Sequence, residues 1–102
     1  MSCIRTEDGG TVRLAFTGAL DALTVLDIRP TLDAVAADRP RHVVLDLAEL
    51  GLLDSSGVGA IVSLFKRVKA HDGTLVVVNA HDQPLLVLRE LKLDRLFSTE
   101  LA

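Results

Sequence analysis

The amino-acid sequence predicts an α/β protein with a mixed sheet of four or five strands and helices packed mainly on one face. Three observations support this fold class. Two segments near the N-terminus have the pattern of strands joined by a tight turn, two later apolar runs are typical of buried strands, and the segments that follow them have helical periodicity. The order is ββαβαβα, and its strand–helix–strand units require parallel strands with right-handed crossovers. The 102 residues suit a single domain over residues 1–102.

The first two strands are expected over residues 2–7 and 11–17. The connecting Asp8-Gly9-Gly10 contains residues that readily adopt the positive φ angles of a tight hairpin. The apolar residues of the second strand alternate with other residues, which indicates one covered face. These residues are Val12, Leu14 and Phe16.

A helix is expected over about residues 25–38, with Thr24 and Asp27 resembling a capping arrangement at its start. Pro30 conflicts with this helix because it lacks a backbone donor, so we expect a kink or a later start. The apolar residues that fall on one helical face are Val25, Ile28, Leu32, Val35 and Ala36.

The rest of the chain alternates strands and helices. We expect strands at 42–47 and 74–78, both buried on two faces, helices at about 56–71 and 83–92, and a short edge strand at Leu96-Phe97. The expected inward residues of the two helices are Val58, Ile61, Val62, Phe65 and Val68, then Leu85, Leu88 and Leu91.

Composition argues against several classes of function. With 11 basic and 14 acidic residues the net charge is −3, so the chain has no basic excess for nucleic-acid binding. A single cysteine, Cys3, allows no internal disulfide and no thiolate metal site. The sequence shows no signal peptide and no apolar run of about 18 residues. We therefore expect a soluble cytoplasmic protein without a cofactor or membrane insertion.

The loops that leave the carboxyl ends of parallel strands meet at one edge of a sheet, where functional sites usually lie. Here those loops place Asp21, Asp54, Ser55 and Asn79 within about one helix diameter of each other, some 10–12 Å. Asp54-Ser55-Ser56 stands at the start of a helix, where free backbone N–H groups and the helix dipole favour a phosphate. A helix N-cap explains one of these three polar residues, but not all three.

Two enzymatic interpretations of this edge are weaker. Ser55, His81 and either Asp21 or Asp82 supply the residue types of a hydrolase triad, but Leu53 stands where the strained nucleophile turn needs a glycine. We therefore predict that the chain is not an enzyme.

A nucleotide fingerprint is equally unsupported. Gly57 and Gly59 open a helix after a strand, yet Val62 occupies the third glycine position. The two glycines are better explained by a close approach of backbone to the sheet or to a partner.

Together, the motifs resemble the STAS domain of anti-sigma factor antagonists. The resemblance rests on Asp54-Ser55-Ser56-Gly57-Val58-Gly59 between an apolar strand and an apolar helix that ends at Gly73. Thr17-Gly18-Ala19-Leu20-Asp21 and Leu93-Asp94-Arg95-Leu96-Phe97 support it, so that it covers nearly the whole chain. Ala19, where the family often has Glu, and Pro30 depart from the family pattern.

The resemblance implies a STAS fold and a non-catalytic binding protein that is controlled by phosphorylation. The unphosphorylated form would bind an anti-sigma factor with serine kinase activity and release the sigma factor. Phosphorylation at Ser55, or less readily at Ser56, would break the complex, and a serine phosphatase would restore it. We expect a monomer or a weak dimer. The residues expected to contact the partner are Asp21, Asp54, Ser55, Ser56, Gly57, Val58 and Asn79.

STAS domains also serve as non-catalytic adaptor modules in lipid- or anion-transport complexes, and this function is the alternative. The retained Asp54-Ser55-Ser56 favours the phosphorylation switch, because an adaptor needs no phosphorylation.

Overall fold

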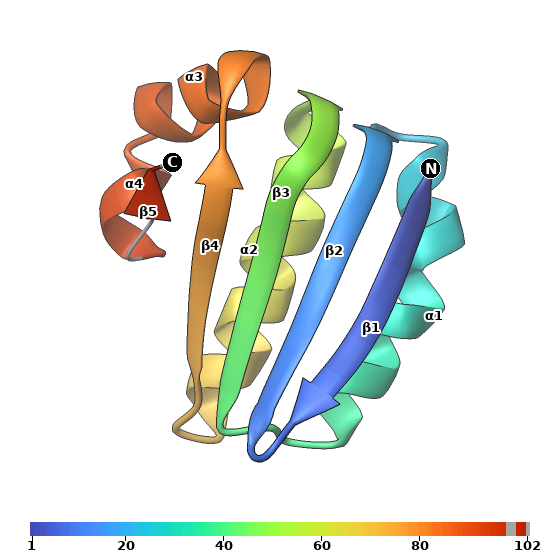
Figure 1. Cartoon of the computed structure of the whole chain (residues 1–102), viewed down its shortest axis with the longest axis vertical. Coiled ribbons are helices and arrows are strands. Elements are labelled where there is room, and N and C mark those ends of the chain that lie inside the picture. The colour runs from blue at the N-terminus through green and yellow to red at the C-terminus, as the bar shows by residue number, and fades with distance from the viewer. Residues whose placement is uncertain (98–99, 102) are drawn as a thin grey trace.

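The computed structural model of the chain describes residues 1–97 and 100–101 and shows a five-stranded sheet in the order β1-β2-β3-β4-β5 (Figure 1). β1 and β2 are antiparallel, and the remaining neighbours are parallel. The strands are β1 (Ser2–Asp8), β2 (Thr11–Leu20), β3 (His42–Leu53), β4 (Thr74–Ala80) and β5 (Glu100–Leu101). The helices are α1 (Thr24–Ala37), α2 (Ser55–Ala70), α3 (Asp82–Glu90) and α4 (Leu93–Leu96). The predicted fold class is confirmed.

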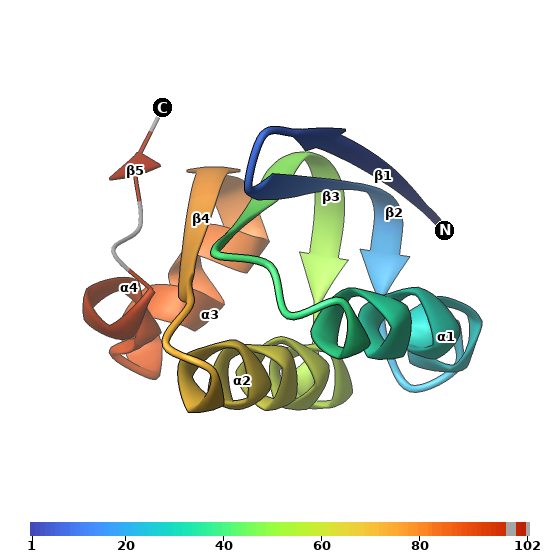
Figure 2. The same ribbon diagram turned by 90° about the horizontal axis from the view of Figure 1, so that it is seen from below.

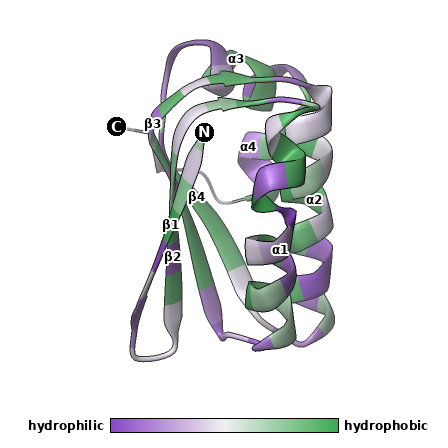
Figure 3. Ribbon diagram, turned by 90° about the vertical axis from the view of Figure 1, so that its right-hand side faces the viewer, coloured by the Kyte–Doolittle hydropathy of each residue, from purple (hydrophilic) through white to green (hydrophobic). Residues whose placement is uncertain are grey.

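The helices α1 and α2 lie side by side against one face of the sheet (Figures 2 and 3). The core lies between these layers, where the inward residues of the central strands meet the inward residues of the helices. Fully buried members include Leu14, Leu45, Leu47, Val77, Val35, Leu64 and Val68. The prediction that β3 and β4 are buried on both faces is wrong, because their other-face residues Val44, Val76 and Val78 are only half-buried.

Helix α1 begins at the predicted position, but a different pair of residues caps it. Asp21 Oδ1 accepts hydrogen bonds from the backbone N–H groups of Leu23 and Thr24, both at 3.0 Å. In return, Thr24 Oγ1 accepts from the N–H of Asp21 at 2.9 Å. Pro30 lies inside the helix without delaying its start. It is exposed, so water can solvate the carbonyl that loses its helical donor.

The C-terminal segment departs from prediction in two places. Leu96 ends helix α4 and Phe97 follows it, so these residues do not form an edge strand; the fifth strand is Glu100–Leu101. Phe97 is fully buried and makes an edge-to-face contact with Phe65, with ring centroids 5.3 Å apart. Leu91 is 54% exposed rather than inward, because α3 already ends at Glu90.

Strands β2 and β3 both run farther than their apolar patterns predicted. β3 extends to Leu53, and its last residues pair only with β2, since its pairing with β4 stops at Asp46 and Val78. Irregularities between Ala15 and Thr17 and between Gly18 and Ala19 accommodate this extension. The end of β3 therefore lies well beyond the paired part of β4.

Candidate functional site

The link between β3 and α2 is one residue long, and hydrogen bonds hold it from both sides. The N–H of Asp54 donates to the carbonyl of Leu20 at the end of β2, at 3.1 Å. Its side-chain Oδ1 accepts from the N–H of Gly57 at 3.0 Å, which makes Asp54 the N-cap of α2. Ser55 and Ser56 are then the first two helical residues, and both are exposed.

Gly57 explains why the helix can begin so close to the sheet. A Cβ atom at this position would lie 2.7 Å from the carbonyl oxygen of Leu20 and 2.8 Å from side-chain carbons of Leu20 and Leu53. At Gly59, one half-turn on, a Cβ would meet nothing within 4 Å. Gly57 thus lets the first turn of α2 pack on β2 and β3, while Gly59 faces open space.

Two residues of the predicted partner surface point inward. Gly57 is buried against Leu20 and Leu53, and Val58 is 9% exposed within the hydrophobic core. Helical periodicity explains both orientations. Because Ser55 and Ser56 face solvent, the next two residues of the helix, Gly57 and Val58, face the sheet. Their contribution to the site is positional, and the exposed surface comes from Ser55 and Ser56.

Asp21 lies beside Asp54 because the carbonyl of its neighbour Leu20 is the acceptor for the N–H of Asp54. The N–H groups of Thr24 and Leu23 stabilise its carboxylate and hold the pKa of Asp21 below its ordinary value. The sheet edge therefore carries two capping carboxylates next to the exposed serines, one at the start of α1 and one at the start of α2.

Asn79, at the end of β4, is hydrogen-bonded to a neighbouring strand. Its amide donates to Asp46 Oδ1 at 3.0 Å, and Asp46 also accepts from Arg13 at 2.8 Å. Asp46 pairs with the end of β4, before the extended end of β3. That Asn79 lies within about 10–12 Å of Ser55 stays a prediction.

Gln83 is a residue of this edge that sequence reasoning missed. Its side-chain oxygen accepts from the N–H of Leu53, and its side-chain nitrogen donates to the carbonyl of the same residue, both at 2.8 Å. The amide thus takes the place of a neighbouring strand at the end of β3, immediately before Asp54. A glutamine in the first turn of a helix gives no sequence signal for such a contact.

The hydrolase arrangement considered from the sequence is not assembled. One ring nitrogen of His81 is hydrogen-bonded to the carboxylate of Asp82, at 2.7 Å, and the other is hydrogen-bonded to the carbonyl of Ala48, at 2.8 Å. The hydrogen bond to Asp82 raises the pKa of His81 above its ordinary value, and the hydrogen bond to the Ala48 carbonyl raises it by a smaller amount. Across residues 1–97 and 100–101, Ser55 has no hydrogen bond to a histidine.

In the described part of the chain, no group of three or more His, Cys, Asp or Glu side chains is placed to hold a metal ion. None of the helices that the structure describes has the length and apolar character needed to cross a membrane.

The STAS domain family model matches residues 4–102 of this sequence. The chain belongs to the STAS domain family. The anti-sigma-B factor antagonist of Listeria monocytogenes is 25% identical over 80 residues, which cover 78% of this chain and 70% of that protein.

Solved structures support the same STAS fold. An anti-sigma factor antagonist from Mycobacterium paratuberculosis superposes with a TM-score of 0.87 at 21% identity, covering 96% of this chain and 83% of that one. The Bacillus cell fate determinant SpoIIAA in its phosphorylated form gives 0.79 at 20% identity, over 99% and 91% of the two chains. A sulfate transporter family protein from Wolinella succinogenes gives 0.73 at 14% identity, over 86% and 71%.

The two glycines of the motif predict opposite effects of the same substitution. Gly57→Ala should destabilise the STAS domain by about 1–3 kcal/mol, because the new methyl group overlaps the Leu20 carbonyl. Gly59→Ala should stabilise it by roughly 0.5–1 kcal/mol, because an exposed helix interior prefers alanine. Urea unfolding followed by circular dichroism measures both, and equal free energies of unfolding for the two variants would contradict the packing described.

The depressed pKa of Asp21 predicts a pH effect on stability. Because its folded-state pKa lies below its unfolded value, the carboxylate contributes stability above about pH 4, which is lost as the pH falls through the folded pKa. Asp21→Asn keeps a capping acceptor and removes the titration. Its free energy of unfolding should fall less steeply with acid than that of wild type. Urea unfolding at a series of pH values measures this difference. If the free energy of unfolding of both proteins fell equally with decreasing pH, the pKa of Asp21 would not differ between the folded and unfolded states.

Proposed function

We propose that this STAS domain is an anti-sigma factor antagonist that works by partner switching. The unphosphorylated form binds an anti-sigma factor with serine kinase activity and releases the sigma factor. Phosphorylation of Ser55 ends this binding, and a serine phosphatase restores it. The observation that carries the proposal is the exposed Ser55, held as the first residue of α2 directly after the capping Asp54.

The location of Ser55 suits a residue that must be modified without unfolding its domain. Its side chain is exposed, while the backbone on either side is fixed by Asp54 and by the packing of Gly57. A phosphate at a helix N-terminus meets backbone N–H groups and the positive end of the helix dipole. The folded domain should therefore tolerate the phosphate, and its effect should fall on the partner.

The same phosphate is unfavourable at an interface built for a neutral hydroxyl. It adds about −1.5 to −2 charges beside the carboxylates of Asp54 and Asp21. Binding would require this charge to lose its hydration against the partner surface. If the binding free energy falls by roughly 3–4 kcal/mol as a result, the affinity falls a few hundredfold. This change is large enough for a switch.

Ser56 is the alternative acceptor, since it is also exposed and follows Ser55 in the same turn. The likeness to the family motif assigns the modification to the serine directly after the aspartate, which is Ser55. The proposal also places the protein in the cytoplasm, where sigma factors meet RNA polymerase, and assigns it no catalytic activity of its own.

A second candidate function is that of a non-catalytic adaptor in a lipid- or anion-transport complex. The similarity in fold to a sulfate transporter family protein from Wolinella succinogenes supports this adaptor function as the alternative. The two functions differ in their need for the Ser55 hydroxyl, because an adaptor would bind its complex regardless of phosphorylation.

Substitutions of Ser55 separate these functions. Ser55→Ala should bind the anti-sigma factor with wild-type affinity and resist phosphorylation, because the contact surface stays nearly intact. Ser55→Asp should bind far more weakly, since it adds a carboxylate beside Asp54. Thr6→Asp, exposed on β1, is the matched charge control and should bind like wild type. Calorimetry against each purified serine-kinase anti-sigma factor of the source organism measures the affinities.

Circular dichroism checks folding in these variants, because helix-start substitutions cost roughly 0.5–2 kcal/mol. Equal affinities for Ser55→Ala and Ser55→Asp would refute charge at this position as the switch. Continued phosphorylation of Ser55→Ala would move the acceptor to Ser56 or to another residue.

A further inference from the structure

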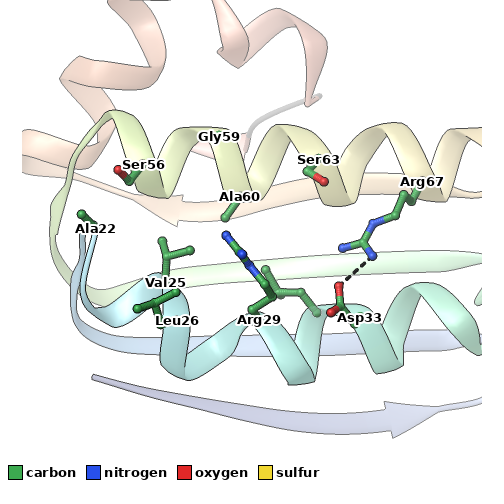
Figure 4. A pocket seen from close by; sticks show the side chains of 11 residues that line it. Ala22, Val25, Leu26, Arg29, Asp33, Ser56, Gly59, Ala60, Ser63 and Arg67 are labelled. Carbon is green, nitrogen blue, oxygen red and sulfur yellow. Dashed lines mark hydrogen bonds and ion pairs between the residues drawn. The ribbon is translucent and has the colours of Figure 1, made fainter.

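A groove runs between α1 and α2, starting at Ser56 of the candidate site (Figure 4). Its volume is about 480 Å³. The residues that line it include Leu26 and Arg29 on α1 and Ser56, Gly59, Ala60 and Ser63 on α2.

The groove exists because the first half of α2, up to Ser63, presents small residues toward α1. Ser56, Gly59, Ala60 and Ser63 follow the i, i+3, i+4, i+7 spacing of one helical face, a stripe about 10 Å long. Gly59 leaves open space where a side chain would otherwise fill the gap between the helices. The two helices pack at their sheet-facing residues, and their outer edges stay apart.

The groove contains one cation that has no partner within the domain. Arg29 extends from α1 toward Ala60 across the hollow (Figure 4). The carboxylate one turn along the same helix, Asp33, is already paired with Arg67 at 2.8 Å at the far end of the groove. Within residues 1–97 and 100–101, Arg29 makes no ion pair or side-chain hydrogen bond.

An exposed aliphatic side chain lies next to this cation. Leu26, one turn before Arg29 on α1, is 61% exposed on the wall of the groove. An unpaired guanidinium beside a leucine and a floor of small residues matches a ligand surface that combines a carboxylate with aliphatic groups.

We propose that the groove receives a segment of the anti-sigma factor in which an acidic residue is flanked by aliphatic residues. The carboxylate pairs with Arg29, and the aliphatic side chains fill the space between Leu26 and Gly59. This inference rests on the proposed function. It extends that binding surface from Ser55 along α2 to Ser63, with Ser56 common to both parts. Ser55 then sets whether the partner binds, while the groove supplies affinity and selects the partner.

Charge reversal of Arg29 tests this surface by calorimetry with the purified serine-kinase anti-sigma factor that binds the wild-type chain. Arg29→Glu should weaken binding by about tenfold or more, and Arg29→Lys should retain most of the affinity. Arg89→Glu makes the same change on the exposed face of α3 and should leave the affinity unchanged.

Filling the groove is an independent arm of the same experiment. Ser63→Leu should weaken binding by about tenfold or more by occupying the space of the partner segment, whereas Ser63→Ala leaves the groove open and should bind like wild type. Thermal unfolding of each variant checks the fold, and the exposed Arg29 keeps the test valid if Ser63→Leu lowers stability.

The outcomes separate the two proposals. If Ser55→Asp weakens binding while Arg29→Glu and Ser63→Leu do not, the groove proposal is overturned and the proposed function stands. If no serine-kinase anti-sigma factor binds the wild-type chain, both are overturned. Sedimentation of the chain alone gives the last outcome, because a dimer that Arg29→Glu dissociates would assign the groove to a second copy and overturn the partner segment.

Discussion

The close approach of the first turn of α2 to the ends of β2 and β3 is the contact on which the site depends. It is possible only because Gly57 has no side chain to meet the Leu20 carbonyl. Asp54 is hydrogen-bonded to both β2 and α2, so the one-residue link from strand to helix is held on both sides. Ser55 and Ser56 are thereby positioned on the surface at a helix N-terminus, directly after a residue that is hydrogen-bonded on both sides.

Periodicity predicted the fold well because the apolar faces of α1, α2 and β2 are regular. It failed where the outcome depends on contacts between distant segments. The extension of β3 to Leu53 relies on pairing with β2 through two irregularities, which the apolar pattern of the strand does not reveal. The Gln83 amide that mimics a strand at Leu53 depends on where α3 docks, which no local pattern encodes. The motif residues were placed correctly at the helix start, and Val58 is buried as helical periodicity predicted, although the motif had also assigned it to the partner surface.

In the two proposals, the site and the groove contribute to partner recognition in physically different ways. At the tip of α2, two capping carboxylates and two exposed hydroxyls make a surface on which one added phosphate changes the charge sharply. Along the groove, the small residues of α2 and the unpaired Arg29 provide volume and a fixed charge that modification of Ser55 leaves unchanged. A switch of this kind needs no rearrangement of the fold, because the hydrogen bonds that fix the loop involve backbone and capping groups rather than the serine hydroxyls.

We propose that phosphate at Ser55 acts on the partner surface and leaves the STAS fold intact. The decisive experiment is to prepare the wild-type chain phosphorylated at Ser55 and to measure two quantities on one sample. These are its thermal unfolding and its affinity for the serine-kinase anti-sigma factor. We expect an unfolding temperature close to that of the unphosphorylated chain together with an affinity reduced a few hundredfold, which corresponds to roughly 3–4 kcal/mol. An unchanged affinity, or a loss of binding accompanied by unfolding, would contradict it.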